Sequence, residues 1–234
     1  NKLVLSPGIV TGTAAPTSAR ISVGCKSPLT GGIKEANAGT SFGQGMARMG
    51  LRALVVEGKP AEEGWWLAHV TWDKKAEAPN VEFMPADEYT GRDLYEVFPE
   101  LFERFGKKVG IAGVGVSGEF LYGNSGVVFE DQEGRPARYA GRGGVGAVMG
   151  SKGLKFIVLD QKGAPGVELA DKQQFNKGRK ALTAAIMEHD ITKPKGGLNT
   201  YGTAVLINIM NEAGGLPTNN FRDGRFAGAP KIAG

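Results

Sequence analysis

Residues 137–160 read ARYAGRGGVGAVMGSKGLKFIVLD and place a glycine-rich turn, a short helix and a buried strand in direct succession. The glycines from Gly141 to Gly146 match the pattern G-x-G-x-x-G, and Asp160 follows nineteen positions after the first of them. A dinucleotide-binding βαβ unit needs a crossover of about a dozen residues or more, whereas about eight residues separate Val145 from Gly153. The stretch therefore argues against a doubly wound parallel sheet.

Short strands separated by glycine- and proline-rich turns make up most of the chain up to Asp160. Runs rich in β-branched and aromatic residues predict strands at 2–5, 20–25, 32–37, 51–57, 65–72, 81–84, 107–112, 126–130 and 154–160. Helical spacing and capping residues predict helices at 40–49 and 92–105. The second of these carries an aromatic stripe that we expect to pack in the core: Tyr95, Phe98, Phe102 and Phe105. Because strands do not alternate regularly with long helices, we expect an α+β fold with antiparallel-rich β-sheets and short helices.

The composition changes after Asp160, where Gly163-Ala164-Pro165-Gly166 has the character of a linker. Beyond it, the spacing of apolar residues predicts helices at 172–188 and 203–213. We therefore expect one domain over residues 1–162 and the beginning of a helical second domain over residues 163–234.

Composition and charge exclude several classes of protein. The chain has 37 glycines in 234 residues but no G-X-Y period, which excludes collagen, and its 41% hydrophobic and 22% charged residues exclude a disordered chain. The net charge of +4 comes from scattered Lys and Arg, which favours a solvated surface over a nucleic-acid partner. The apolar runs are far shorter than the roughly 20 residues of a membrane helix, so we expect no membrane association either.

Cys25 is the single cysteine of the chain. One thiol permits no internal disulfide and no cysteine-based zinc or iron–sulfur site made by this chain alone, and it suits the reducing cytoplasm. Because the sequence starts at Asn1 without Met and ends at Ala-Gly, we expect it to be a piece of a longer protein.

The glycine-rich turn offers anion chemistry. Successive glycines let backbone amides approach a phosphate, a helix beginning near Gly144 adds its positive end, and Arg138 and Arg142 add forked donors. A purely structural turn remains the alternative. The other G-x-G-x-x-G match, Gly113 to Gly118, is too closely followed by further glycines to open a crossover helix, and we interpret it as a tight turn.

Catalytic side chains are not evident. The two histidines, His69 and His189, lie in an alternating strand and near a helix end, and no nucleophile motif accompanies them. We therefore assign no catalytic residue from the sequence.

Two segments together carry a family resemblance. Residues 11–39, TGTAAPTSARISVGCKSPLTGGIKEANAG, and residues 137–155, ARYAGRGGVGAVMGSKGLK, resemble two segments of the aldehyde ferredoxin oxidoreductases, which hold tungsten, and in some cases molybdenum, between two pterins. The first segment is similar to the amino-terminal domain and the second to the other pterin-contacting segment of that family. The resemblance implies that residues 1–162 form a tungstopterin-binding domain that lacks its first strands.

The resemblance also implies a set of site residues. Arg20 falls on an arginine that reaches a pterin phosphate, and Asn37 and Tyr139 fall on residues whose main-chain oxygens bind the magnesium ion that links the two phosphates. The implied cofactor-binding set is Arg20, Asn37, Gly39, Arg138, Tyr139, Gly141, Arg142 and Gly143. Tyr139 replaces a small residue, a change that a backbone ligand tolerates.

The implied activity is the tungsten-dependent oxidation of an aldehyde to a carboxylic acid, with electrons passing through a [4Fe–4S] cluster to ferredoxin or an electron-transfer subunit. The cysteines that bind this cluster in the family are absent here, so we expect the remaining domains of the enzyme to supply them and the chain alone to be inactive. A homodimer is compatible with the family. Two other functions stay open: an aromatic acyl-CoA reductase of the same family, and a non-catalytic nucleotide- or phosphate-binding module.

Overall fold

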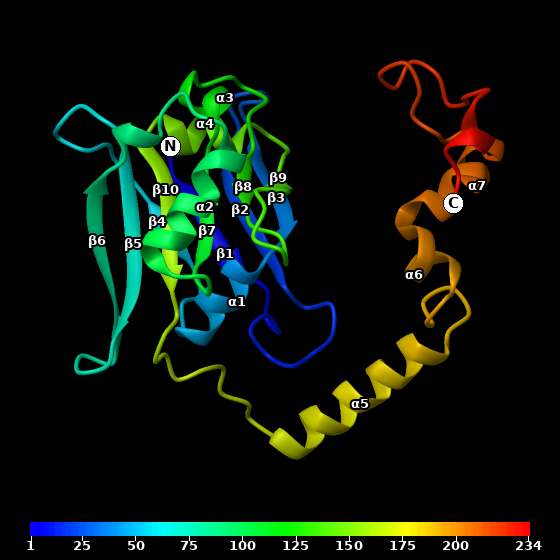
Figure 1. Ribbon diagram of the computed structural model, residues 1–234, viewed down its shortest axis with the longest axis horizontal. Helices are drawn as coiled ribbons and strands as arrows, with labels where there is room; N and C mark the ends of the chain where they lie inside the picture. Colours follow the sequence, from blue (N-terminus) through cyan, green and yellow to red (C-terminus); the bar gives the residue numbers. More distant parts are fainter. The chain divides into compact units, whose positions relative to one another are not determined.

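Ten strands and four helices build the first of two units in the chain, Asn1–Glu168, and the second unit is Leu169–Gly234 (Figure 1). The computed structural model describes all residues from 1 to 234. The strands of the first unit form two sheets.

The first sheet is antiparallel throughout. In spatial order its strands are β3 (Ile33–Gly39), β2 (Arg20–Lys26), β1 (Leu3–Pro7) and β4 (Leu54–Val56). Residues on one face of β1 and β2 are buried, among them Leu3, Leu5, Ile21 and Val23. The alternation of buried and exposed positions along these strands is the period-two pattern that predicts them.

The second sheet has one parallel pair, between β10 and β5, and is otherwise antiparallel. In spatial order its strands are β6 (Ala78–Pro85), β5 (Trp66–Asp73), β10 (Leu154–Asp160), β7 (Gly110–Gly113), β8 (Val127–Phe129) and β9 (Arg138–Ala140). The expected α+β fold with antiparallel-rich sheets is thus confirmed, and the doubly wound sheet is excluded. The strand expected at 51–57 is shorter, since only Leu54–Val56 pairs, and β9 was not expected from the sequence.

Helix α1 (Ser41–Arg48) lies between the two sheets and contacts β1 and β2 of one and β7 and β10 of the other. Thr40 caps it, because the hydroxyl oxygen accepts a hydrogen bond from the Phe42 amide at 3.1 Å. Phe42 and Met46 are fully buried at this junction. The helix therefore joins the two sheets into one core.

Helix α4 (Val145–Gly150) follows the glycine-rich turn and is buried along its whole length. It contacts α3 (Val116–Glu119), and a Cβ at Gly150 would lie closer than van der Waals contact to the carbonyl oxygen of Gly118. The segment from Gly113 to Gly118 is held from the other side by Lys155, whose Nζ donates to the Val114 carbonyl at 2.7 Å and pairs with Glu119. It is a tight turn into one helical turn, as expected.

Helix α2 (Leu94–Phe105) covers one face of the second sheet and begins after Asp93, whose carboxylate accepts from the Tyr95 amide at 2.8 Å. Phe98 of the expected aromatic stripe is fully buried against Phe156, and Phe102 and Phe105 are half-buried. Tyr95 was wrongly placed in the core, since its side chain is 57% exposed. At the start of the helix, that position faces away from the sheet.

The second unit contains α5 (Lys172–Glu188), α6 (Gly197–Tyr201) and α7 (Ile207–Glu212), and none of these helices has a buried residue. A single helix was expected over 203–213, but a 3₁₀ segment, Gly202–Leu206, precedes α7. Neither unit has a helix with the length and apolar character needed to cross a membrane.

The backbone contact between α4 and α3 generates a stability prediction. Gly150→Ala should lower the free energy of unfolding by about 1–3 kcal/mol, because the new methyl group meets backbone that cannot rotate away. Gly24→Ala in β2 is the matched control: the nearest atom, the Lys34 carbonyl oxygen, would be 3.8 Å away, and the free energy should rise by up to about 1 kcal/mol. Urea unfolding of both variants measures the difference, and equal effects would contradict the packing.

Candidate functional site

Two unpaired sheet edges meet in the first unit. Strand β3 is the last strand of the first sheet and β9 is the last strand of the second, and the two lie side by side without forming a ladder (Figure 1). An unpaired edge leaves backbone amides and carbonyls free for another partner. The junction of β3 and β9 is therefore a candidate site for a bound ligand.

The hydrogen-bond phase of β3 shows which backbone groups are free. The Thr40 amide donates to the Ala19 carbonyl at 3.0 Å, and Ala19 and Thr40 continue the register in which Arg20 is opposite Gly39. In an antiparallel ladder, pairs of opposite residues that exchange backbone hydrogen bonds alternate with pairs that do not. Since Ala19 and Thr40 form a bonded pair, the pairs Arg20–Gly39 and Ser22–Asn37 are not bonded. The main-chain groups of Asn37 and Gly39 consequently point away from β2, toward the side on which β9 lies. Tyr139 is the middle residue of β9.

The edge cavity is a hollow of about 530 Å³ at this junction. It brings together four of the residues expected in the site: Asn37, Tyr139, Gly141 and Arg142. Its other lining residues are Lys34, Glu35 and Ala36. A Cβ at Gly141 would have no protein atom closer than 3.9 Å, so the protein interior does not require glycine there. A ligand that lies close to the backbone at this position would require glycine.

The large cavity is a hollow of about 740 Å³ that is lined by three more of the expected residues: Arg20, Gly39 and Arg138. Gly143 lines neither cavity. Its φ is 72°, and a Cβ would overlap the Lys34 side chain, which gives it a structural reason to be glycine. Seven of the eight expected residues thus lie around two hollows.

The arginines of these cavities have no protein partner. Arg20, Arg138 and Arg142 make no ion pair and no side-chain hydrogen bond, which is also true of the exposed Arg52 outside the cavities. By contrast, Arg48 donates to the Gly12 carbonyl, and Arg92, Arg104 and Arg135 pair with carboxylates. A free guanidinium fork at the wall of a hollow can bind a phosphate or carboxylate in bidentate fashion.

Lys107 and Lys108 also line the large cavity and were not expected from the sequence. They follow the glycine that ends α2, and neither makes an ion pair or side-chain hydrogen bond. Two adjacent lysines in an exposed turn resemble any solvated surface pair, so only the fold reveals that they face Arg20 and Arg138.

The carboxylates of the large cavity are occupied by protein donors. The Oε1 of Glu130 accepts from the hydroxyls of Thr40 at 2.7 Å and Ser41 at 2.6 Å and from the Phe42 amide at 2.9 Å, and Oε2 accepts from the Ile111 amide at 2.7 Å. Glu130 is 3% exposed. Burial raises the pKa of Glu130, and these hydrogen bonds act against the rise.

Asp131 is held by the loop that follows it. Its carboxylate accepts from the Glu133 and Arg135 amides at 2.9 Å and pairs with the Arg135 guanidinium. Burial acts to raise the pKa of Asp131, but the bonds from Arg135 and Glu133 outweigh it and lower the pKa. With Glu130 and Asp131 both engaged, the free charges of the large cavity are positive.

The amino terminus of α4 does not contribute to either cavity. The Gly146 amide donates to the Ser125 carbonyl at 3.0 Å, and Gly144 packs against Gly123 and Pro28. At this end of the helix the Gly146 amide is thus bonded within the protein, and none of residues 143–146 lines either cavity.

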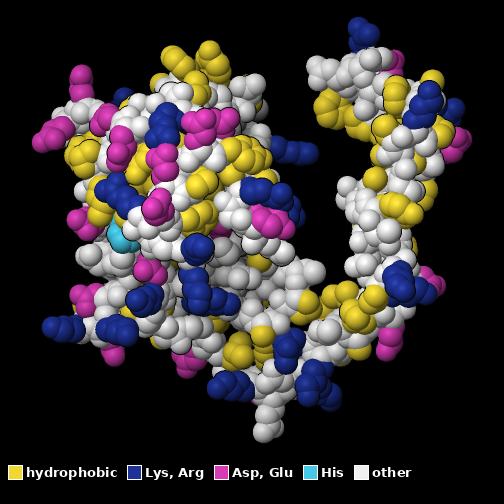
Figure 2. All heavy atoms as spheres, in the orientation of Figure 1, with side chains coloured by type: hydrophobic (Ala, Val, Ile, Leu, Met, Phe, Trp, Pro, Cys, Tyr) yellow, Lys and Arg dark blue, Asp and Glu magenta, His cyan; other side chains and the backbone are white.

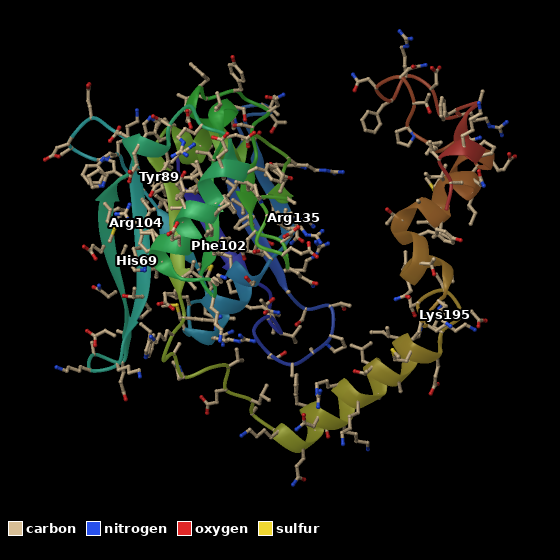
Figure 3. The ribbon with its side chains drawn as sticks, in the orientation of Figure 1. His69, Tyr89, Phe102, Arg104, Arg135 and Lys195 are labelled. Atoms are coloured by element: carbon tan, nitrogen blue, oxygen red, sulfur yellow. The ribbon has the colours of Figure 1, made fainter.

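His69 lies outside both cavities. Its ring is 4.7 Å from that of Phe105, and Figure 3 shows His69 close to Arg104 and Tyr89 beside α2. Burial lowers the pKa of His69, and its Nε2 has no hydrogen-bond partner. Nothing in its surroundings suggests a reacting group. On the face drawn in Figure 2, basic and acidic side chains of the first unit are interspersed, which matches the expected solvated surface.

The donor set decides what kind of ligand fits. No group of three or more His, Cys, Asp or Glu side chains could hold a metal ion. The available groups are guanidinium forks, lysine ammonium groups and the free main-chain groups of β3. They suit an anionic ligand, whose charged groups can accept from the guanidinium forks and lysine ammonium groups.

Comparison with protein families gives two matches. The model described as "Aldehyde ferredoxin oxidoreductase, N-terminal domain" matches residues 1–161, and the one described as "Aldehyde ferredoxin oxidoreductase, domains 2 & 3" matches residues 177–234. The family expected from the two sequence segments is confirmed.

Curated relatives agree with this match. The tungsten-containing aldehyde ferredoxin oxidoreductases of Pyrococcus abyssi and Pyrococcus horikoshii are each 40% identical to the chain over 235 residues. The alignment covers 100% of the chain and 36% of each relative, so the chain spans about a third of their length.

Among solved structures, the active site complex BamBC of benzoyl coenzyme A reductase, in complex with 1,5-dienoyl-CoA, has a similar fold. The TM-score is 0.74 at 21% sequence identity, over 93% of this chain and 31% of that one. At this identity the similarity establishes the fold alone.

The burial of Glu130 generates a prediction about pH. Because its folded-state pKa lies above the ordinary 4.5, the stability that it contributes is fully present below pH 4.5 and is lost as the pH rises through the raised value. The side chain in Glu130→Gln cannot ionise, so it adds no such pH dependence. Its amide nitrogen cannot accept the hydrogen bond from the Ile111 amide, and this loss lowers the free energy of unfolding by about 1–3 kcal/mol at low pH. The deficit of the variant should therefore shrink as the pH rises above 4.5.

Urea unfolding across this range measures the free energy of both proteins. The exposed Glu63 provides the control, since Glu63→Gln should follow the wild type at every pH. A deficit of Glu130→Gln that stays constant with pH would show that Glu130 titrates alike in the folded and unfolded chain.

Proposed function

The chain belongs to the aldehyde ferredoxin oxidoreductase family, and we propose that its first unit binds the phosphates of a bis-pterin tungsten cofactor in an enzyme that oxidises aldehydes to carboxylic acids. One observation carries the proposal: three arginines without protein partners, Arg20, Arg138 and Arg142, line two hollows at the junction of two unpaired sheet edges. We propose tungsten as the metal because the relatives are named as tungsten-containing enzymes.

Each group at the junction has a proposed role. Arg20 and Arg138 bind phosphate oxygens from the large cavity, and Arg142 does so from the edge cavity. The main-chain oxygens of Asn37 and Tyr139, on facing edges, would hold a magnesium ion that neutralises phosphate charge. Gly39 and Gly141 let the ligand approach the backbone. A bound tungsten would supply the two-electron chemistry of aldehyde oxidation, and this chain's residues orient its pterins and neutralise their phosphates.

Other parts of the reaction need residues outside this chain. Cys25 is buried on β2 and is the only cysteine, so the thiolates of a [4Fe–4S] cluster would come from elsewhere in the enzyme. We propose ferredoxin or an electron-transfer subunit as the electron acceptor and the cytoplasm as the location. The 234 residues alone would not oxidise aldehydes, since the chain spans 36% of the length of the relatives.

An aromatic acyl-CoA reductase is the second candidate, because the benzoyl coenzyme A reductase complex shares the fold. The sequence identity of 40% with the aldehyde ferredoxin oxidoreductases, against 21% with that complex, favours aldehyde oxidation. Metal and pterin analysis of the intact enzyme, followed by assays with aldehydes and with benzoyl-CoA, separates the two. Absence of tungsten, molybdenum and pterin would leave only a phosphate-binding module.

The arginine forks generate a prediction for the intact enzyme. Arg20→Lys and Arg138→Lys should each weaken cofactor binding by about tenfold or more, because a lysine cannot form the paired hydrogen bonds and a charged hydrogen bond contributes about 1.5–3 kcal/mol. Metal and pterin content after dialysis measures the loss. Arg52→Lys is the matched control, since Arg52 is exposed and lines neither cavity. Full cofactor content in both test variants would contradict the assignment.

A further inference from the structure

The buried carboxylate of Glu130 lies in the wall of the large cavity, among the segments that carry its unpaired cations. These cations come from three separate places in the chain: Arg20, Lys107 with Lys108, and Arg138. Like charges repel, so cations from distant segments need a common support if they are to converge on one anion. Glu130 is linked to all three segments.

One oxygen of Glu130 holds the chain next to Arg20. Oε1 accepts hydrogen bonds at 2.6–2.9 Å from three groups at the start of α1: the hydroxyls of Thr40 and Ser41 and the amide of Phe42. Thr40 directly follows Gly39, which is opposite Arg20 in the β2–β3 ladder. The Thr40 amide also donates to the carbonyl of Ala19, the residue before Arg20, at 3.0 Å. A shift of Thr40 would therefore move the backbone that carries Arg20.

The other oxygen of Glu130 holds β7. The β7–β8 ladder ends one residue before Glu130, and beyond it the Ile111 amide donates to Oε2 of Glu130 at 2.7 Å. Strand β7 begins two residues after Lys108. The carboxylate thus fixes the strand that follows the two lysines.

Arg138 is linked to Glu130 through the backbone. Phe129, the residue before Glu130, is opposite Arg138 in the β8–β9 ladder. The connection between these strands is closed by the Asp131 amide, which donates to the Arg135 carbonyl at 2.8 Å. One side chain therefore joins the backbone segments next to all four cations.

Glu130 does not occupy the cations that it lies among. Its four hydrogen bonds all come from hydroxyls and backbone amides, and it forms no ion pair. Because neutral donors occupy both oxygens, the guanidinium forks of Arg20 and Arg138 stay free for a ligand.

We propose that Glu130 is a positioning residue of the large cavity, which holds the four cations in one arrangement without contacting the bound anion itself. The inference rests on the proposed function, which makes Arg20 and Arg138 phosphate-binding groups. Cations that are already in place bind an anion more tightly, because they do not have to be ordered when it arrives.

Two substitutions separate the shape of Glu130 from its charge. Glu130→Gln keeps the length but has a single acceptor oxygen, so it can serve α1 or β7 but not both. Glu130→Asp keeps the carboxylate but is one methylene shorter. Neither variant adds negative charge to the cavity, so charge alone predicts unchanged or tighter binding of an anion. Displacement of the cations predicts weaker binding.

Equilibrium dialysis of the cofactor-free 234-residue chain with pyrophosphate measures the effect. We expect both Glu130 variants to bind pyrophosphate about fivefold or more weakly than the unsubstituted chain, after correction for the folded fraction found by urea unfolding. Gly150→Ala is the matched control: its stability should fall by a similar amount, but Gly150 does not line the large cavity, so its affinity should not change. Thr40→Val preserves the side-chain shape and removes one donor, so it should weaken binding even where a Glu130 variant does not fold.

A double-substitution cycle tests whether Glu130 acts through the arginines. Arg138→Gln should weaken pyrophosphate binding by about tenfold in the unsubstituted chain. It should weaken binding by a smaller factor in Glu130→Gln, because a displaced guanidinium contributes less to binding. A merely structural role of Glu130 predicts the same factor in both.

Three results would overturn the proposal: Glu130 variants that bind pyrophosphate as Gly150→Ala does or more tightly, an equal effect of Arg138→Gln in both backgrounds, or no pyrophosphate binding by the unsubstituted chain. The proposed function fails separately. Full metal and pterin content of the intact enzyme with Arg20→Lys and with Arg138→Lys would contradict the cofactor assignment, whereas the pyrophosphate measurements are made without cofactor and still decide the role of Glu130.

Discussion

The buried carboxylate of Glu130 joins the parts of the first unit on which the site depends. It follows β8 and accepts hydrogen bonds from the start of α1 and from β7, so one side chain links the helix between the sheets to the second sheet. Thr40 and Ser41, which it holds, directly follow β3. The position of the edge strand relative to β9 therefore depends on this carboxylate.

Glycine has two different uses around this core. Gly150 and Gly146 allow α4 to lie directly on the backbone of Gly118 and Gly126, which brings the turn before α4 close to β8. Gly141 has neither a blocked Cβ position nor a positive φ, and it opens onto the edge cavity. The glycines of α4 thus allow close packing inside the unit, whereas Gly141 leaves space for a ligand at the edge cavity.

Local pattern predicts the strands and helices that have a clear period, such as β2, β10 and α5, whose limits differ from expectation by no more than one residue. It does not reveal β9, because three residues are too few for a period, nor the parallel pair of β5 and β10, whose partners are about ninety residues apart. The site residues came from similarity to known segments. Lys107 and Lys108 carry no local signal, and neither does the partnership of Glu130 with Thr40 and Ser41, which are about ninety residues away.

The distribution of charge links the stability of the unit to its ligand. Arg20, Arg138, Lys107 and Lys108 line one hollow, while the nearby carboxylates of Glu130 and Asp131 are committed to protein donors. Like charges held together without counter-ions repel, and the repulsion acts only in the folded chain. An anion that binds there removes this repulsion and binds the folded state alone, so it raises the free energy of unfolding. The same unpaired cations that destabilise the empty unit give it selectivity for a multiply charged ligand.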